Sequence, residues 1–254
     1  MVGESRDSKL YAKCIQSVRE YCSRHKISHI IQTHPKLRIA PDVFTSNRSQ
    51  ESHAKHGGYL PIYEKENAFN YLDSFDQICI LDADIYIRED APNIFEDFGT
   101  EKAWGSVCER EMPITPEYKR KIINYSQMQY NNLHPRPNFR PNEFGFEFFN
   151  MGMILINTQL FKPYLKGQTA EQFIRRFEFQ KFVDGEGAWK WSTDQTLLNY
   201  FLKKYEVPVK HMNWKWNGLF TANTNIKECH FVHFFLKDKL PAKGENIERL
   251  MALI

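Results

Sequence analysis

Two aspartates follow the most continuous short apolar run in the chain. The run QICIL at 77–81 leads directly into Asp82-Ala83-Asp84. Side chains at alternate positions of an extended chain point the same way, so we expect Asp82 and Asp84 on one side of the backbone. Paired carboxylates supply the oxygen ligands that Mg²⁺ and Mn²⁺ prefer. The pair is predicted to hold such a cation; the alternative is two aspartates in a surface turn.

A histidine and a lysine near the C-terminus add to this chemistry. They lie in HFFLKDKLP at 233–241, directly after an apolar run. The imidazole of His233 is a competent third ligand for Mn²⁺, and His230 competes with it for that role. Lys239 can approach the same phosphate groups as a point charge. The alternative is a histidine at the edge of the core, followed by a solvated run of charges.

A third group of polar residues precedes the apolar run at 153–157. Asn150 offers a donor and an acceptor to sugar hydroxyls. Gly152 permits close approach of the backbone to a ligand. The alternative is a simple turn before a strand.

A fourth group, Ser192-Thr193-Asp194-Gln195, opens an expected helix over 194–204. Ser192 or Thr193 is a good N-cap, so capping explains the hydroxyl residues. Capping does not require Gln195. Asp194 and Gln195 are placed to contact a sugar or to stabilise developing positive charge at the helix N-terminus.

The elements expected in the first 110 residues alternate between helix and strand. Helices are predicted over 7–26, 61–74 and 91–98, and strands over 29–32, 77–81 and 103–108. This alternation is typical of an α/β fold with a mostly parallel sheet and helices on both faces. Ligands of such sheets bind beyond the carboxyl ends of the strands, which is where Asp82 and Asp84 lie.

The second half predicts a smaller antiparallel part on the acceptor side. Helices are expected over 116–128, 168–183 and 194–204, and strands over 151–157, 207–213 and 228–236. No linker divides the chain, so we expect a single domain over 1–254. Its nucleotide-binding half covers about 1–110 and its acceptor and catalytic half about 111–254. Few residues precede the first helix, so the first strand is expected to be very short or to lie outside this sequence.

Composition excludes several classes of protein. The 254 residues are 42% hydrophobic and 26% charged, which indicates a globular chain. A net charge of +3 is too small for a dedicated nucleic-acid-binding protein. No apolar run is long enough to span a membrane. Five cysteines without a CxxC pair favour a reduced, cytoplasmic protein. The alternative is a lumenal catalytic domain trimmed from a membrane-anchored enzyme, and the oligomeric state stays open.

In this order, the four groups resemble the motifs of nucleotide-sugar glycosyltransferases with the GT-A fold. LDAD looks like the DxD motif, FNMG with ILIN like the NxG segment, and TDQ like the DQ motif. HFFLKDKLP is similar to the closing motif of the retaining family that contains glycogenin and bacterial lipopolysaccharide galactosyltransferases. The pattern covers about residues 60–241. A yeast-type galactosyl- or mannosyltransferase family with similar elements is a close alternative.

The resemblance implies a metal-dependent transfer of sugar from a nucleoside diphosphate sugar, UDP favoured, to a hydroxyl of a glycan or glycoconjugate. It implies that Asp82, Asp84 and His233 hold Mn²⁺ or Mg²⁺. The implied donor-binding residues are Lys65, Asp82, Ala83, Asp84, Asn150, Gly152 and Lys239, and the implied catalytic residues are Asp194 and Gln195. Leu236, Leu240 and Pro241 depart from the closing motif, which leaves the subfamily open.

The resemblance also implies retention of anomeric configuration, with Gln195 or Asp194 near the cationic sugar. An inverting enzyme needs a carboxylate base, for which Asp194, Glu143 and Glu147 are the candidates. Aromatic and arginine side chains within 110–148 and 184–191 are expected to bind the acceptor. The tryptophans at 189, 191, 214 and 216 are expected to form a second platform, and the alternative for each is packing in the core.

Two other functions remain as alternatives. A haloacid-dehalogenase-type phosphatase also places D-x-D after a strand, although Tyr86 stands where that family has Thr or Val. A non-catalytic sugar- or nucleotide-binding relative would keep the fold but would not need a diphosphate-binding histidine and lysine.

Overall fold

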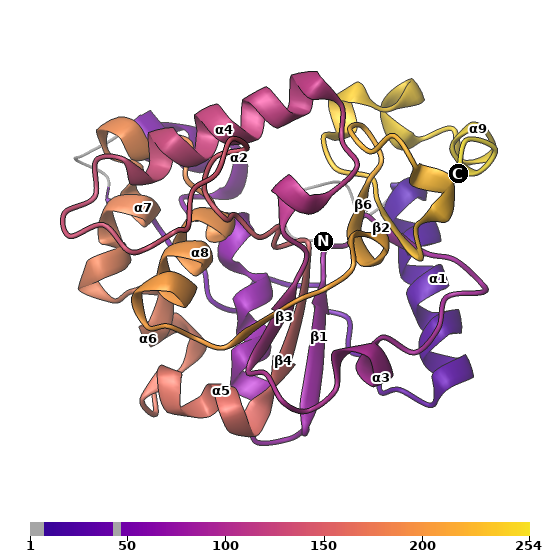
Figure 1. Cartoon of the computed structure of the whole chain (residues 1–254), viewed down its shortest axis with the longest axis horizontal. Helices are drawn as coiled ribbons and strands as arrows, with labels where there is room; N and C mark the ends of the chain where they lie inside the picture. The colour runs from indigo at the N-terminus through magenta and orange to yellow at the C-terminus, as the bar shows by residue number, and fades with distance from the viewer. Residues whose placement is uncertain (1–7, 43–46) are drawn as a thin grey trace.

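The computed structural model describes residues 8–42 and 47–254. Its helices are α1 (Lys9–His25), α2 (Asn47–His56), α3 (Ile94–Phe98), α4 (Pro116–Tyr130), α5 (Thr158–Leu165), α6 (Ala170–Ile174), α7 (Gln180–Asp184), α8 (Asp194–Lys204) and α9 (Ile247–Met251), joined by short 3-10 helices. Figure 1 shows the strands at the centre, with α4 to α8 on one side and α1, α3 and α9 on the other. None of the helices in these two segments is long and apolar enough to cross a membrane.

The strands form two small sheets. The larger sheet has the order β1-β4-β3-β5 and the smaller one the order β2-β7-β6. The strands are β1 (Gln77–Leu81), β2 (Ile85–Ile87), β3 (Trp104–Ser106), β4 (Met153–Asn157), β5 (Val209–His211), β6 (Gly218–Leu219) and β7 (Phe231–His233). This arrangement confirms the predicted α/β class.

The pairing of strands is more mixed than the mostly parallel sheet that was predicted. β4 runs antiparallel to both β1 and β3, whereas β3 and β5 are parallel. In the smaller sheet, β7 is antiparallel to β2 and parallel to β6. The reason is where the chain enters β4: Gly152 O accepts a hydrogen bond from Asp82 N at 2.8 Å, so β4 starts where β1 ends and runs back between β1 and β3.

The central strand β4 joins the two main parts of the core. All five of its residues are buried. Ile154 and Ile156 belong to the cluster that includes Phe161 of α5 and Phe201 of α8. Met153 and Leu155 belong to the cluster on the opposite face, with residues of α1, α3 and β7. Burial on both faces explains why this strand is a continuous apolar run.

Helix α8 forms where the sequence predicts it, and its first turn holds two predicted site residues, Asp194 and Gln195. The Thr193 side chain accepts a hydrogen bond from Gln195 N at 3.2 Å, and Thr193 N donates to Thr196 Oγ1 at 3.4 Å. This reciprocal cap satisfies backbone groups that the first turn would otherwise leave unpaired. It holds Asp194 and Gln195 in that turn, while Leu198 and Phe201 bury the helix against the sheet.

The predicted strand at 29–32 is wrong. This segment is irregular, and Ile30 and Ile31 are 54% and 38% exposed. The buried Glu64 carboxylate accepts backbone hydrogen bonds from Lys36, Leu37 and Arg38 just beyond it. These bonds give the loop's amides a side-chain partner in place of a neighbouring strand.

Two predicted helices are broken into shorter pieces. The segment 61–74 forms two 3-10 helices, η1 (Pro61–Tyr63) and η2 (Lys65–Tyr71). The segment 168–183 is divided into α6, a 3-10 turn and α7. The division occurs at Arg176, whose extended backbone lets its guanidinium donate to Tyr164 O and Gln168 Oε1. Tertiary hydrogen bonds therefore override the helical periodicity.

Strand β1 lies at the edge of its sheet. Among the described residues it pairs only with β4, and four of its five residues are partly exposed. A cavity of about 1000 Å³ lies beside this edge, and residues 27–34, β1 and the face of α1 containing Cys14 and Val18 line it. The apolar sequence of β1 had predicted burial on both faces, which the structure does not show.

Candidate active site

Three predicted metal ligands come together where the two sheets meet. Asp82 and Asp84 follow β1, and His233 ends β7. Strand β2 begins immediately after Asp84, and its first residue, Ile85, pairs with His233. A backbone hydrogen bond of 3.0 Å from Phe234 N to Asp84 O closes this junction. The pairing of β2 with β7 therefore brings together residues about 150 positions apart in the sequence.

The three side chains have the geometry of a metal site. One ligand atom from each of Asp82, Asp84 and His233 lies within 4.8 Å of the other two. His233 Nε2 is 3.3 Å from Asp84 Oδ1 and 3.7 Å from Asp82 Oδ2. Two carboxylates and an imidazole suit Mn²⁺, and the carboxylates also suit Mg²⁺. The donor set thus fits a divalent cation.

The electrostatics of the cluster favour the charged form of the Asp84 carboxyl group. Burial alone would raise the pKa of Asp84, but the His233 imidazole outweighs it and holds that pKa below its ordinary value. Burial lowers the pKa of His233, and Asp84 more than compensates and raises it. Asp84 and His233 therefore share a proton strongly, and a divalent cation bound between the ring and the carboxylates would take its place.

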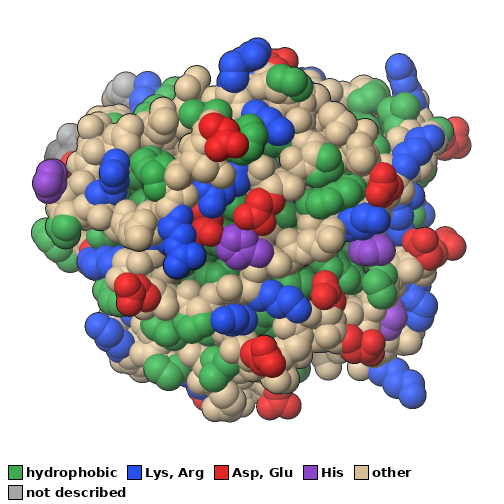
Figure 2. Space-filling view, in the orientation of Figure 1, with side chains coloured by type: hydrophobic (Ala, Val, Ile, Leu, Met, Phe, Trp, Pro, Cys, Tyr) green, Lys and Arg blue, Asp and Glu red, His purple; other side chains and the backbone are tan. Residues whose placement is uncertain are grey.

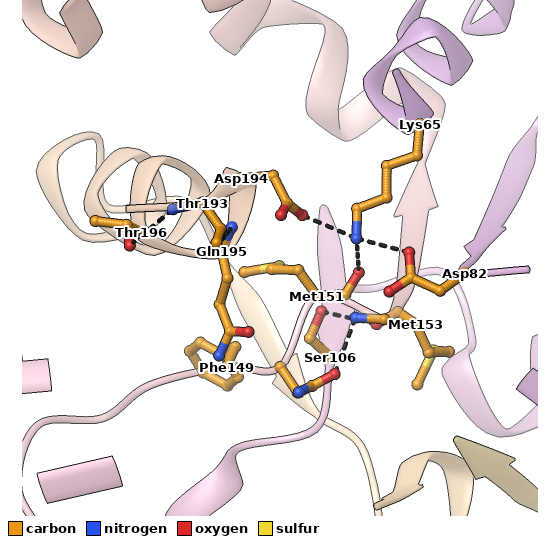
Figure 3. A network of polar contacts seen from close by, with 12 residues as sticks. Lys65, Asp82, Ser106, Phe149, Met151, Met153, Thr193, Asp194, Gln195 and Thr196 are labelled. Carbon is orange, nitrogen blue, oxygen red and sulfur yellow. Dashed lines mark hydrogen bonds and ion pairs between the residues drawn. The ribbon is translucent and has the colours of Figure 1, made fainter. Parts of the chain in front are cut away.

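Lys65 links both aspartate motifs. Its Nζ lies 2.9 Å from Asp82 Oδ1, 2.8 Å from Asp194 Oδ2 and 2.6 Å from Met151 O. Figure 3 shows this amino group between the two carboxylates. Burial lowers the pKa of Lys65, but Asp194 and then Asp82 outweigh it, so the net shift is upward. The three acceptors match the three N–H donors of a charged lysine.

Gly152 makes room for His233. A Cβ at this position would lie 2.3 Å from His233 Cε1 and 2.6 Å from Nδ1. The close approach that the sequence predicted at Gly152 is thus an approach to a proposed metal ligand. Asn150 lies two residues earlier, is buried, and accepts the Gly152 N–H at 2.9 Å.

Gln195 contacts a buried glutamate. Its Nε2 donates to Glu109 Oε1 at 2.8 Å, and Asn150 Nδ2 donates to the same oxygen at 2.7 Å. Burial raises the pKa of Glu109, although these two amides partly offset the effect. The DQ and NxG segments therefore meet at one carboxyl group, which lies just beyond the end of β3.

The cavity beside β1 reaches this cluster. Its lining includes Lys65, Asp82, Ala83, Asp84 and Asp194. Figure 2 shows acidic, basic and histidine side chains gathered near the centre of the face seen in Figure 1. A concave site with converging charged groups is the usual form of a ligand pocket.

Several predicted candidates lie elsewhere. Lys239 is exposed at the end of a 3-10 helix, and in residues 8–42 and 47–254 it makes no ion pair with the metal cluster. His230 packs against Trp216 with ring centroids 4.8 Å apart, so it does not compete with His233. Glu143 is exposed, and the buried Glu147 pairs with Lys203 and with His211 at 3.1 Å.

The four tryptophans predicted as a second platform differ in burial. Trp216 is buried, and Trp189 and Trp214 are packed against the core. Trp191 is 61% exposed, three residues before Asp194, and its carbonyl accepts a hydrogen bond from Tyr125 OH at 2.9 Å. It is the most exposed of these four rings.

Sequence reasoning missed Glu109 and Asn217. Glu109 directly follows the predicted strand at 103–108, so the rule that selected Asp82 would also have selected it. Asn217 Oδ1 lies 3.1 Å from His233 Nδ1, and no pattern in the sequence indicates this contact.

The chain is similar to known glycosyltransferases in sequence and in structure. A model of glycosyl transferase family 8 matches residues 9–239. Similar solved structures include mouse xyloside xylosyltransferase 1 in its apo form, with 16% identity over 91% of this chain and 74% of that chain and a TM-score of 0.42. A glycosyltransferase involved in glycosylation of the major capsid of PBCV-1 has 12% identity over 96% and 95%, with a TM-score of 0.48.

A third similar structure is galactosyltransferase LgtC in complex with donor and acceptor sugar analogs. It has 16% identity over 96% of this chain and 91% of that chain, with a TM-score of 0.48. A sequence search of curated proteins finds no match.

Proposed function

Because the chain belongs to glycosyl transferase family 8 and is a GT-A fold glycosyltransferase, we propose that it moves a sugar from a nucleoside diphosphate sugar to a hydroxyl of a glycan or glycoconjugate. The family membership excludes the phosphatase alternative. The observation that carries the proposal is the meeting of Asp82, Asp84 and His233 at a cavity of about 1000 Å³. We favour UDP as the nucleotide.

Asp82, Asp84 and His233 are the residues that would hold Mn²⁺ or Mg²⁺. A divalent cation at this site would neutralise the negative charge of a departing diphosphate. Lys65 holds Asp82 through an ion pair of 2.9 Å and so positions one carboxylate of the set. Lys239 is exposed, and in the proposal it binds the diphosphate.

The donor sugar would lie against Asn150, Gly152, Asp194 and Gln195. Asp194 is 7% exposed and its carboxylate faces Lys65, so it is poorly placed to act as a free base. Glu143 and Glu147 are exposed or already paired with Lys203 and His211. These observations favour retention, with Gln195 as the polar group beside the reacting sugar, over inversion by a carboxylate base.

The two halves of the chain have separate parts in this proposal. Residues up to about 110 bind the nucleotide, and those from about 111 bind the acceptor and complete the catalytic site within one domain. The exposed Trp191 next to α8 suits stacking against an acceptor sugar. The five cysteines, all among the described residues, are free thiols, which supports a cytoplasmic location.

Calorimetric titration tests the donor site. Nucleoside diphosphates are titrated into the protein with Mn²⁺ and with EDTA, and Asp84→Ala is compared with wild type. We expect one nucleotide to bind only with Mn²⁺ and to lose at least about tenfold in affinity in Asp84→Ala. Asp238→Ala is the matched control, because this aspartate is 91% exposed and lies outside the cluster.

Two outcomes would contradict the proposal. A folded protein that binds no nucleotide with Mn²⁺ is instead the non-catalytic relative. Equal binding with EDTA would exclude the metal-dependent part. Once a donor is identified, NMR of the product's anomeric proton distinguishes retention from inversion.

A further inference from the structure

A row of buried polar side chains connects His233 to Glu109. His233 Nδ1 is 3.1 Å from Asn217 Oδ1, and Asn217 Nδ2 is 2.8 Å from Asn150 Oδ1. Asn150 Nδ2 is in turn 2.7 Å from Glu109 Oε1. The four side chains come from four separate parts of the chain, and all four residues are at most 6% exposed. Buried polar groups of this kind must be paired with the correct donor and acceptor on each side.

The direction of the row is fixed at Asn150. The Gly152 backbone N–H can only donate, and it lies 2.9 Å from Asn150 Oδ1. On the other side, Glu109 Oε1 also receives the amide of Gln195, so it acts as an acceptor for both. The Asn150 amide therefore has its oxygen toward Gly152 and its nitrogen toward Glu109, and the reverse orientation would oppose donor to donor.

The same logic determines the orientation of Asn217. Because Asn150 Oδ1 is an acceptor, Asn217 presents its NH₂ group to it and its oxygen to His233. An oxygen 3.1 Å from Nδ1 requires a proton on that nitrogen. With its proton on Nδ1, the ring has Nε2 as the nitrogen that faces Asp84 Oδ1, 3.3 Å away, where a cation would replace a proton.

We propose that Asn217 is a positioning residue that accepts the Nδ1–H of His233 and fixes the ring, so that Nε2 is presented as a metal ligand. Gly152 and Glu109 set the orientation of Asn217 through Asn150. The inference rests on the proposed function in its metal site. Groups that orient a ligating histidine in this way change metal affinity by about 10- to 100-fold when they are removed.

The row has a second consequence for the site. Gln195 on α8 and His233 on β7 are both oriented by contacts that lead to Glu109. The proposed sugar-facing amide and the proposed metal ligand thus share one support, although 38 positions separate them in the sequence. Loss of this support is expected to disturb both.

Nitrogen NMR of the metal-loaded protein tests the ring orientation directly. Long-range ¹H–¹⁵N spectra are recorded with the site saturated by Zn²⁺, a diamagnetic cation that imidazole binds well. The His233 signals are assigned by their absence from His233→Asn. We expect the pattern of an Nδ1–H ring in wild type, and a ring protonated on Nε2 would overturn the proposal.

Two substitutions at Asn217 test its effect on the metal site. Asn217→Ser keeps a hydroxyl that can accept the Nδ1 proton and donate to Asn150, whereas Asn217→Leu has similar volume to Asn217 and neither donor nor acceptor. In calorimetric titrations with MnCl₂ alone, we expect the dissociation constant of Asn217→Leu to rise about 10- to 100-fold and that of Asn217→Ser to rise less. Equal affinities in Asn217→Leu and wild type would overturn the proposal.

The tests separate this inference from the proposed function. If Mn²⁺ binds but no nucleotide does, the transferase proposal fails and the role of Asn217 stands. If nucleotides bind and Asn217→Leu retains the affinity of wild type for Mn²⁺, the role of Asn217 fails alone. If Asn217→Leu does not fold, the NMR measurement on wild type decides the question by itself.

Discussion

At the scale of single residues, position 152 must be glycine because the His233 ring leaves no room for a side chain there. A Cβ added at this position would lie only 2.3 Å from Cε1 of the His233 ring. The Gly152 carbonyl also accepts Asp82 N at 2.8 Å. The backbone here thus lies against both a carboxylate residue and the imidazole of the proposed metal site, so the smallest possible side chain is needed.

Gly152→Ala is therefore expected to damage metal binding. The new methyl group and the His233 ring cannot occupy the same space, so the ring must turn away from Asp84. We expect the dissociation constant for Mn²⁺ to rise at least about tenfold, measured by calorimetry. Circular dichroism of the same sample checks the fold. An unchanged Mn²⁺ affinity would show that the ring is not confined by this backbone.

A second prediction concerns the cost of charging Glu109. Burial raises its pKa above the ordinary value of 4.5, so the folded state holds this proton more tightly than the unfolded state. Stability from this group is present at low pH and is lost as pH rises from about 4.5 through the folded pKa, at about 1.4 kcal/mol per pH unit. Glu109→Gln removes this dependence, because the amide does not ionise.

Urea unfolding at several pH values checks this sign. The stability of Glu109→Gln relative to wild type is expected to increase with pH from about 4.5 upward and then to level off. The exposed Glu143→Gln is the control and should show no such trend. A relative stability that falls with rising pH would mean that neighbouring donors, not burial, dominate the environment of Glu109.

The sequence predicted those site residues whose type and position are both distinctive. Asp82, Asp84 and His233 each follow or end a strand, and the structure brings them together. Glu109 could have been found by its place after a predicted strand, whereas Asn217 was missed because its role lies in a contact with a distant segment. Lys239 is exposed, and its predicted contact with the diphosphate stays a prediction.

At the scale of elements, Lys65 joins four segments. It lies in η2, and its amino group contacts Asp82 after β1, Met151 before β4 and Asp194 in α8. The side chain of Lys65 is 17% exposed and that of Asp194 is 10% exposed. Removing one member of such a buried pair leaves an uncompensated charge, which costs more than an ion pair at the surface.

Lys65→Met tests this contact. The substitution keeps the length of the side chain but removes the cation, so we expect a loss of about 3 kcal/mol in the free energy of unfolding. Lys121→Met is the matched control, because Lys121 forms a 2.8 Å pair with Glu117 on the exposed face of α4 and its loss should change little. Equal melting temperatures for the two variants would contradict the structural role of Lys65.

The elements also show what local sequence can and cannot predict. α8 begins and ends where predicted, because its cap and its apolar face agree with each other. The strand at 29–32 was wrong because periodicity says nothing about whether a pairing partner is present. The predicted helix at 61–74 forms two 3-10 helices instead of one α-helix, and Glu64 at the junction accepts long-range backbone hydrogen bonds from Lys36 and Arg38.

At the scale of the whole molecule, one edge of β1 pairs with no strand among the described residues, so its outward-facing backbone groups make no hydrogen bonds to a neighbouring strand. Asp82 N donates to Gly152 O, and Thr158 N donates to Asp76 O, so hydrogen-bonded pairs fall at even positions of β1. In an antiparallel pair such bonds alternate, which directs the amides of Gln77, Cys79 and Leu81 toward the cavity. Within residues 8–42 and 47–254 no strand covers that edge.

Hydrogen exchange measured by NMR distinguishes the two sets of amides. We expect Cys79 and Leu81 to exchange at least about tenfold faster than Ile78 and Ile80, although all four lie in one strand. Residues of β4, which are paired on both sides, should be slowest. Uniform protection along β1 would mean that its outer edge is covered in solution.

The open edge of β1 also bears on how the protein behaves at high concentration. An unpaired edge is a template for another copy, and sheets usually discourage this with lysine, proline or a bulge at the edge strand. β1 is QICIL and contains none of these, and its outer edge adjoins Ile30 and Ile31, which are partly exposed. We therefore expect the β1 strands of two molecules to pair edge to edge as the protein concentration rises, which would limit the concentration at which the protein stays monomeric.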